Sequence, residues 1–192
     1  NGDPLTLDAD GEGSLKEYVK RVVMESAQRA SDQGVDLSDK PWLIVENGKV
    51  QGMDFTAYVK DITRMKTAPA FDALDLESPE NDLFGNETTN CRHFTEYSTA
   101  HTKAQSACAE AEVVKMMNPM EYILDEKAEK AQHFRIRHGE CDRDTSLVIS
   151  AMLTAKLREA GCEVDYHSPW NTPHAGDYDL DELFAWIDGI CG

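Results

Sequence analysis

The stretch HFRIRHGECDRDTSLVISAML (residues 133–153) has the form of a β-strand, a polar loop and the start of a helix. The helical pattern ends at Gly161, a residue type that favours helix ends. EVDYHSPW (residues 163–170) then indicates a second strand, and residues 179–190 have the spacing of an amphipathic helix. Two strands joined through a helix run parallel, with a right-handed crossover. The sequence therefore predicts an α/β fold for the end of the chain.

The residues before this α/β pattern predict a largely helical region with one hairpin. Ser14 and Glu17 form a capping box before an i, i+3, i+4 apolar stripe. Asn47-Gly48 is the preferred pair for a two-residue turn between strands. Helical patterns also cover residues 55–66 and 98–117, and a long polar loop separates them.

Asn118-Pro119 ends the last of these helical patterns, so we place a domain boundary near residue 118. Two β-α units are too few to form a sheet with covered edges. We therefore expect the chain to be the end of a larger α/β structure. It begins at Asn1 without a methionine, which indicates a processed product or a fragment of a longer polypeptide.

Acidic residues outnumber basic ones by 36 to 19, which gives a formal net charge of −17. Nucleic acids and anionic membranes carry charge of the same sign and would be repelled. No apolar run approaches the roughly 20 residues that cross a bilayer. We expect neither a nucleic-acid nor a membrane partner, and the compartment stays open.

The five cysteines are widely spaced and form no C-x-x-C pair, so a zinc site is not expected. The odd number allows a free thiol or a bridge to another chain. Buried, reduced cysteines are an equally good interpretation of this pattern.

Asp142 and His174 are the two residues that point to catalysis, since each follows a predicted strand. Reactive groups in open α/β sheets gather outside the carboxyl ends of the strands. In hydrolytic triads of this kind the order along the chain is nucleophile, acid, base. Two other interpretations stay open: Asp142 or Asp144 would cap the following helix, and His174 would be a surface residue.

The expected nucleophile is not found in this sequence. None of the ten serines has a glycine two residues before it and another two residues after it, as in G-x-S-x-G. The order of the triad requires a nucleophile that precedes the acid. We therefore expect the serine upstream, in a separate polypeptide or in another part of the same precursor.

Three longer motifs resemble bacterial tannases (tannin acyl hydrolases) of subtype B. They are TRMKTAPAFDALDLESPENDLFG (residues 63–85), RIRHGECDRDTS (residues 135–146) and PWNTPHAGDYDLDELFAWI (residues 169–187). The resemblance runs from about residue 14 to the end. It implies a serine esterase that releases gallic acid from gallate esters, with an α/β-hydrolase fold and a large, mainly helical inserted lid. Residues 1–118 would be part of the lid and residues 119–192 the C-terminal part of the core.

The resemblance also implies roles for five residues. By position, Asp142 is similar to the triad acid and His174 to the triad base. Lys66, Glu80 and Asp144 match residues that hold the galloyl ring. Carboxylates would accept hydrogen bonds from its phenol hydroxyls and an ammonium group would donate to them. The implied enzyme needs no metal or organic cofactor, and its partner is an N-terminal companion chain or segment with the G-x-S-x-G serine.

Two alternatives to a gallate esterase stay open at this point. In the first, the chain is part of an esterase for other phenolic acyl groups, such as feruloyl esters. In the second, it is a non-catalytic, lid-like subunit with a binding or regulatory role, in which Asp142 and His174 are structural. Taken without the resemblance, Lys66 and Glu80 would be solvated surface charges.

Overall fold

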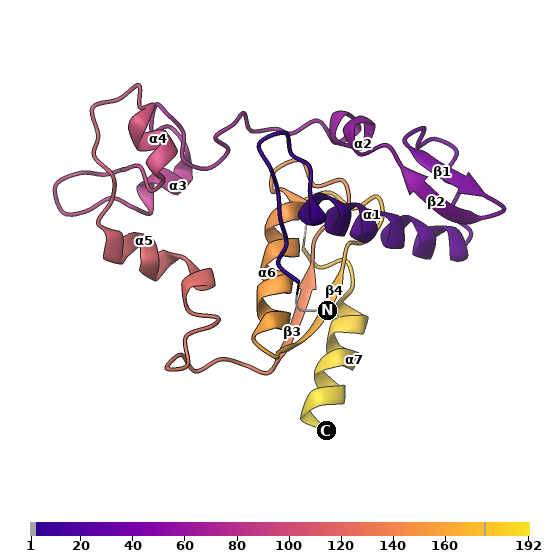
Figure 1. Cartoon of the computed structure of the whole chain (residues 1–192). Coiled ribbons are helices and arrows are strands. Elements are labelled where there is room, and N and C mark those ends of the chain that lie inside the picture. Colours follow the sequence, from indigo (N-terminus) through magenta and orange to yellow (C-terminus); the bar gives the residue numbers. More distant parts are fainter. Residues whose placement is uncertain (1–2, 175) are drawn as a thin grey trace. The chain divides into compact units, whose positions relative to one another are not determined.

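The computed structural model describes residues 3–174 and 176–192 (Figure 1). These residues form two compact units. One unit joins the residues up to Thr63 with those from Lys130 onward, and the other is Arg64–Glu129. This division differs from the predicted boundary near residue 118. The physical reason is a shared core, because apolar side chains before Thr63 pack against those of the α/β part.

The first unit contains a parallel strand pair and an antiparallel hairpin, as the sequence predicts. In the parallel pair His133 lies opposite Glu163, and Arg137 lies opposite His167. In the hairpin turn Asn47 and Gly48 have φ values of 51° and 74°, the left-handed conformation that such a turn requires. The elements in chain order are α1 (Ser14–Asp32), β1 (Leu43–Glu46), β2 (Lys49–Met53), α2 (Phe55–Ile62), β3 (His133–Arg137), α6 (Leu147–Glu159), β4 (Glu163–His167) and α7 (Leu180–Cys191).

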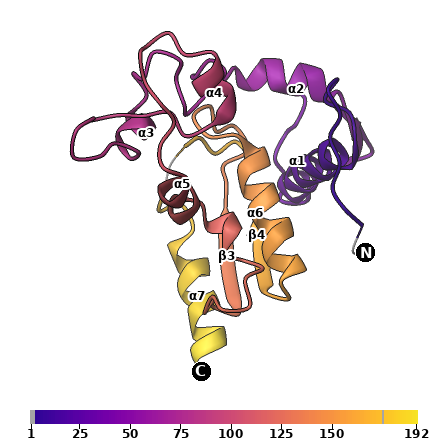
Figure 2. The same ribbon diagram turned by 60° about the vertical axis from the view of Figure 1, so that its left-hand side comes forward.

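The β3–β4 pair lies between two helices, with α6 on one side and α7 on the other in both views (Figures 1 and 2). Helix α1 packs against α6 and β2. The core between these elements is formed by Val19, Val22, Val23, Trp42, Met53, Tyr58, Leu147, Ala151 and Tyr166. Burial of each valine, leucine or methionine side chain in this core stabilises the unit by about 1.5–3 kcal/mol relative to its exposure.

Two helix ends in this unit differ from the prediction. Ser14 is the first residue of α1 and does not cap it, because its Oγ accepts a hydrogen bond from the backbone N–H of Thr6 at 2.8 Å. Helix α2 ends at Ile62, four residues before the predicted end at Lys66, since Thr63 adopts a left-handed conformation with φ 48°. Every helix of residues 3–174 and 176–192 is too short or too polar to cross a membrane.

The second unit has little regular structure. Its short helices are α3 (Pro79–Asp82), α4 (Glu96–Ala100), α5 (Ala111–Met117) and the 3-10 turn η1 (Pro119–Glu121). The predicted helix over residues 98–117 is wrong, because residues 101–110 leave the helical path. Their backbone bonds elsewhere, with Lys103 N–H donating to the Leu74 carbonyl at 2.7 Å and Ala109 N–H to the His93 carbonyl at 2.7 Å.

A buried carboxylate orders these loops. Oδ1 of Asp72 lies 2.7 Å from Nδ1 of His93 and accepts from Nδ2 of Asn81 at 2.8 Å. Its Oδ2 accepts from the backbone and the hydroxyl of Thr95. Burial by itself would raise the pKa of Asp72, but these hydrogen bonds outweigh it and hold the pKa below its usual value. The long polar loop is therefore ordered around an ionised aspartate.

Candidate active site

Two loops meet at the carboxyl ends of β3 and β4: the Asp142 loop (residues 138–146) and the His174 loop (residues 168–174). Backbone hydrogen bonds join them, since Glu140 N–H donates to the Pro169 carbonyl at 2.9 Å and Cys141 N–H to the Thr172 carbonyl at 3.1 Å. The parallel register of the strands brings both loops to the same edge. The predicted acid and base are therefore placed on neighbouring loops.

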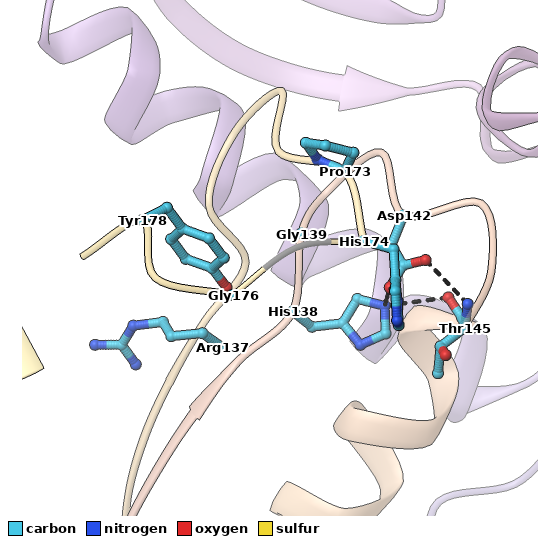
Figure 3. Close-up of a pocket in the computed structure, with 9 residues that line it drawn as sticks. All are labelled: Arg137, His138, Gly139, Asp142, Thr145, Pro173, His174, Gly176 and Tyr178. Atoms are coloured by element: carbon cyan, nitrogen blue, oxygen red, sulfur yellow. Dashed lines mark hydrogen bonds and ion pairs between the residues drawn. The ribbon is translucent and has the colours of Figure 1, made fainter. Parts of the chain in front are cut away.

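Asp142 and His174 form a direct hydrogen bond, with Oδ2 of Asp142 2.9 Å from Nδ1 of His174 (Figure 3). The carboxylate is 6% exposed, whereas the imidazole is 61% exposed. A buried acceptor at Nδ1 keeps the proton on that nitrogen, so the lone pair of the neutral ring is on Nε2. This is the tautomer that a general base needs to take a proton at Nε2.

Hydrogen bonds from His174 and from two backbone donors keep the Asp142 carboxylate ionised. Its Oδ1 accepts from the N–H of Asp144 at 2.8 Å and from that of Thr145 at 2.9 Å. Burial alone would raise the pKa of Asp142, but the bonds from His174, Thr145 and Asp144 hold the pKa below its usual value. Neither aspartate caps α6, because the N-cap residue is Ser146.

A second imidazole, which the sequence interpretation did not place in the site, also approaches Asp142. Nε2 of the buried His138 lies 3.4 Å from Oδ2 of Asp142 and 3.2 Å from the Thr145 carbonyl. In the sequence HGECD the histidine precedes Asp142 by four residues. This spacing predicts a side-chain contact within a helix, but not in a loop such as this one. His138 and His174 therefore both approach Oδ2 of the Asp142 carboxylate.

These residues line a pocket of about 370 Å³ at the ends of the strands (Figure 3). His138, Asp142 and His174 contribute to its wall, with Arg137 and Tyr178. Asp144 is also close to the base, since its Oδ2 lies 3.8 Å from Nε2 of His174. The structure therefore brings together three of the five predicted site residues in the first unit.

An ion-pair cluster holds Asp179, which precedes α7, against β3 and β4. Nη2 of Arg135 donates to Oδ2 of Asp179 at 2.6 Å, immediately before α7. Arg137 donates to Asp165 on β4 at 2.7 Å and lies 3.3 Å from Asp179. The side chain of Arg135 is 6% exposed and that of Asp179 is 21% exposed, so this contact is largely shielded from solvent. Thr172 before the histidine and Asp179 after it are thus both tied to the strands or their loops.

The other two predicted site residues, Lys66 and Glu80, lie together in the second unit. Nζ of Lys66 is 2.7 Å from Oε1 of Glu80 and 4.7 Å from the centroid of the Phe71 ring. Ser78 Oγ donates to the other carboxylate oxygen. The hydrogen bond from Lys66 lowers the pKa of Glu80, so this carboxylate is ionised at neutral pH. An ammonium group, a carboxylate and an aromatic ring thus form one cluster.

Clusters of three or more histidine, cysteine or acidic side chains able to hold a metal ion do not occur in residues 3–174 and 176–192. All five cysteines are free of disulfide bonds within this chain.

Gly139 allows the close approach of the two loops. A Cβ atom at this position would lie 2.2 Å from the Thr172 carbonyl oxygen and 2.5 Å from that of Pro173. We expect Gly139→Ala to separate the loops and to lower the free energy of unfolding by about 1–3 kcal/mol, as overpacking does. Gly176→Ala is the matched control, because among the described residues no atom beyond its chain neighbours lies within 4 Å of its added Cβ. Equal unfolding curves for the two variants would contradict this role of Gly139.

Several solved structures of bacterial tannases are strongly similar to this chain. A tannin acyl hydrolase from Lactobacillus plantarum is 43% identical to this chain, with a TM-score of 0.96, over 100% of this chain and 42% of that one. A second tannase structure from the same organism is 44% identical, with a TM-score of 0.94, over 98% of this chain and 40% of that one. The tannase of Fusobacterium nucleatum is 42% identical, with a TM-score of 0.90, over 100% of this chain and 41% of that one.

Further matched structures are of a tannin acyl hydrolase in complex with ethyl gallate and with 3,4-dihydroxybenzoate. No protein-family model and no curated protein sequence matches the chain. The small mixed α/β structure thus corresponds to part of an α/β-hydrolase-like fold. By sequence and by structure this chain is related to the bacterial tannases, of whose length it spans about two fifths.

Proposed function

We propose that this chain is the acid- and base-bearing part of a serine ester hydrolase of tannase type, which releases gallic acid from gallate esters. One observation carries the proposal: the 2.9 Å hydrogen bond between the buried Asp142 carboxylate and Nδ1 of the exposed His174. An exposed imidazole oriented by a buried, ionised carboxylate is typical of a general base. The similarity to solved tannases supports the same reaction class.

In the proposed reaction a serine outside these 192 residues attacks the ester carbonyl. Nε2 of His174 takes the serine proton and then gives it to the leaving alcohol. Asp142 holds the tautomer and stabilises the imidazolium that forms in between. A water molecule, deprotonated by the same nitrogen, then attacks the acyl-serine, and the proton returns to the serine oxygen as gallic acid leaves. Backbone amides near the serine would stabilise the oxyanion.

The β3–β4 sheet has two strands in the part of the chain that the structure describes, which supports a companion segment that completes the sheet and carries this serine. A two-stranded parallel sheet leaves hydrogen-bonding groups open, and parallel sheets are normally buried on both faces. Helices α6 and α7 also expose apolar side chains that a larger core would cover. These are Ile149, Met152, Leu180 and Phe184.

For the acyl group, we propose that Lys66, Glu80 and Asp144 orient the galloyl ring. An ionised carboxylate accepts hydrogen bonds from phenol hydroxyls, and an ammonium group donates to them. In the second unit the Lys66–Glu80 pair is already formed beside Phe71, so donor, acceptor and apolar surface occur together there. The ethyl gallate and dihydroxybenzoate complexes of the matched tannin acyl hydrolase support a phenolic ligand.

Fluorophosphonate labelling of the native protein tests the proposed reaction class. The protein would be purified without denaturation, labelled, separated under denaturing conditions and analysed by mass spectrometry. We expect label on a serine within a G-x-S-x-G peptide that is not part of these 192 residues, because only an activated serine reacts. Label on one of the ten serines of this chain, or none at all, would contradict the proposal.

A further inference from the structure

Glu140 is a buried carboxyl group to which the proposed reaction assigns no role. The residue is 2% exposed and lies between β3 and Asp142. Its Oε2 is 3.4 Å from the backbone N–H of Asn171, which belongs to the His174 loop. Its Oε1 is buried and has no hydrogen-bond partner among the residues that the structure describes. A charge at this position would therefore be poorly compensated.

The backbone of Glu140 connects the same two loops to a third element. Its N–H donates to the Pro169 carbonyl at 2.9 Å, and its carbonyl accepts from the hydroxyl of Tyr58 on α2 at 2.9 Å. One residue thus contacts the His174 loop twice, through its backbone and its side chain. Any movement of Glu140 would be transmitted to the loop that holds the base.

The charged groups around Glu140 do not offset its burial. Burial raises its pKa to about 7, while the N–H of Asn171 and the charge of Lys40 act in the opposite direction. Nζ of Lys40 lies 3.5 Å from Oδ2 of Asp61, so part of its positive charge is neutralised by this carboxylate. The negative charge of Asp61 also raises the pKa of Glu140 further. The nearby negative charge of Asp39 acts in the same way. The protonated, neutral form therefore fits this site best.

We propose that Glu140 is a positioning residue, whose neutral carboxyl group holds the His174 loop against the Asp142 loop and so keeps the base beside its carboxylate. This inference rests on the proposed hydrolase function. It makes the junction between the loops sensitive to pH, because ionisation places an uncompensated charge between them.

The direction of this dependence follows from the two protonation equilibria. The pKa of Glu140 is about 7 when the loops are closed. In an opened, solvated state its pKa returns to the ordinary value of 4.5. The stabilising contribution is therefore complete below pH 4.5 and is lost as the pH rises through about 7. Opening of the loops is expected to increase on the order of a hundredfold between pH 5 and pH 8.

Amide hydrogen exchange of the native protein, resolved to short peptides, measures this opening. Protection factors would be compared at pH 5 and pH 8 after correction for the intrinsic exchange rate. In the wild-type protein we expect the hundredfold loss to be confined to peptides of the two loops. In Glu140→Gln, which cannot ionise, protection should be nearly independent of pH. Glu46→Gln, the same change at an exposed site of the same unit, should behave as the wild type does.

Three results would overturn the proposal. The first is wild-type amide protection that does not change between pH 5 and pH 8. The second is a loss of protection in Glu140→Gln as large as in the wild type. The third is a wild-type loss of protection that is equally large in the β3–β4 peptides and in the two loops. The last would mean a global effect on stability. If Glu140→Gln does not fold, wild-type protection that stays constant between pH 5 and pH 8 still overturns the proposal. The measurement needs no ester turnover, so its outcome is independent of the labelling experiment.

Discussion

His174→Ala is expected to lower kcat/KM for methyl gallate by about 10⁴- to 10⁶-fold in the native, fluorophosphonate-reactive protein, because it removes the group that accepts the serine proton. The side chain is 61% exposed, so its loss leaves the core intact and the unfolding transition should change little. The measurement is steady-state hydrolysis, with circular dichroism and thermal unfolding as checks of the fold.

Asp142→Asn is the companion variant, and we expect it to reduce kcat by roughly 10⁴-fold. An amide can present its N–H to Nδ1 of His174, which would favour the wrong tautomer and place the proton on Nε2. His133→Ala is the control, because this partly exposed histidine pairs with Glu163 at the start of β3, at the end of the strand opposite to the Asp142 loop. If both site variants kept near-normal turnover, Asp142 and His174 would be structural, and a binding or regulatory subunit would be the better description.

Glu80→Gln and Asp144→Asn, made separately, are expected to lower kcat/KM for methyl gallate by about 10- to 100-fold each. The reason is that a hydrogen bond to a charged group contributes about 1.5–3 kcal/mol, and an amide replaces it incompletely. Methyl ferulate lacks the three adjacent hydroxyls of gallate, so its turnover should change much less. The selectivity between the two esters is therefore the quantity to measure.

The control for these variants is Glu77→Gln, an exposed glutamate three residues before Glu80. It should leave the ratio of gallate to ferulate turnover unchanged. Gallate turnover that survives the Glu80 and Asp144 changes would show that the ring is held by other residues. A protein that prefers ferulate before any substitution would instead favour the alternative of a feruloyl-type esterase.

Several features of this chain could be predicted from local sequence patterns. The parallel pair β3–β4, the crossover helix α6 and the Asn47-Gly48 turn follow from periodicity and turn chemistry, which involve neighbouring residues. The positions of Asp142 and His174, each just past a predicted strand, predicted that they lie at one edge of the sheet. In the structure Oδ2 of Asp142 is 2.9 Å from Nδ1 of His174.

Other features depended on contacts between distant segments. The packing of α1 against α6, with Val23 and Ala151 in one core, places the residues before Thr63 with the α/β part, whereas the sequence indicated a boundary near residue 118. The helix predicted over residues 98–117 is interrupted because Leu74 and His93 offer acceptors from elsewhere in the chain. Periodicity contains no information about such partners.

The site shows the same division. Local patterns were enough to predict which side chains follow the strands, and so that Asp142 and His174 would lie at one edge of the sheet. The approach of His138 to Asp142 and the burial of Glu140 against the His174 loop became visible with the packed fold. The physical reason is that burial and the protonation of a buried group depend on everything packed around it, and those neighbours come from segments far apart in the sequence.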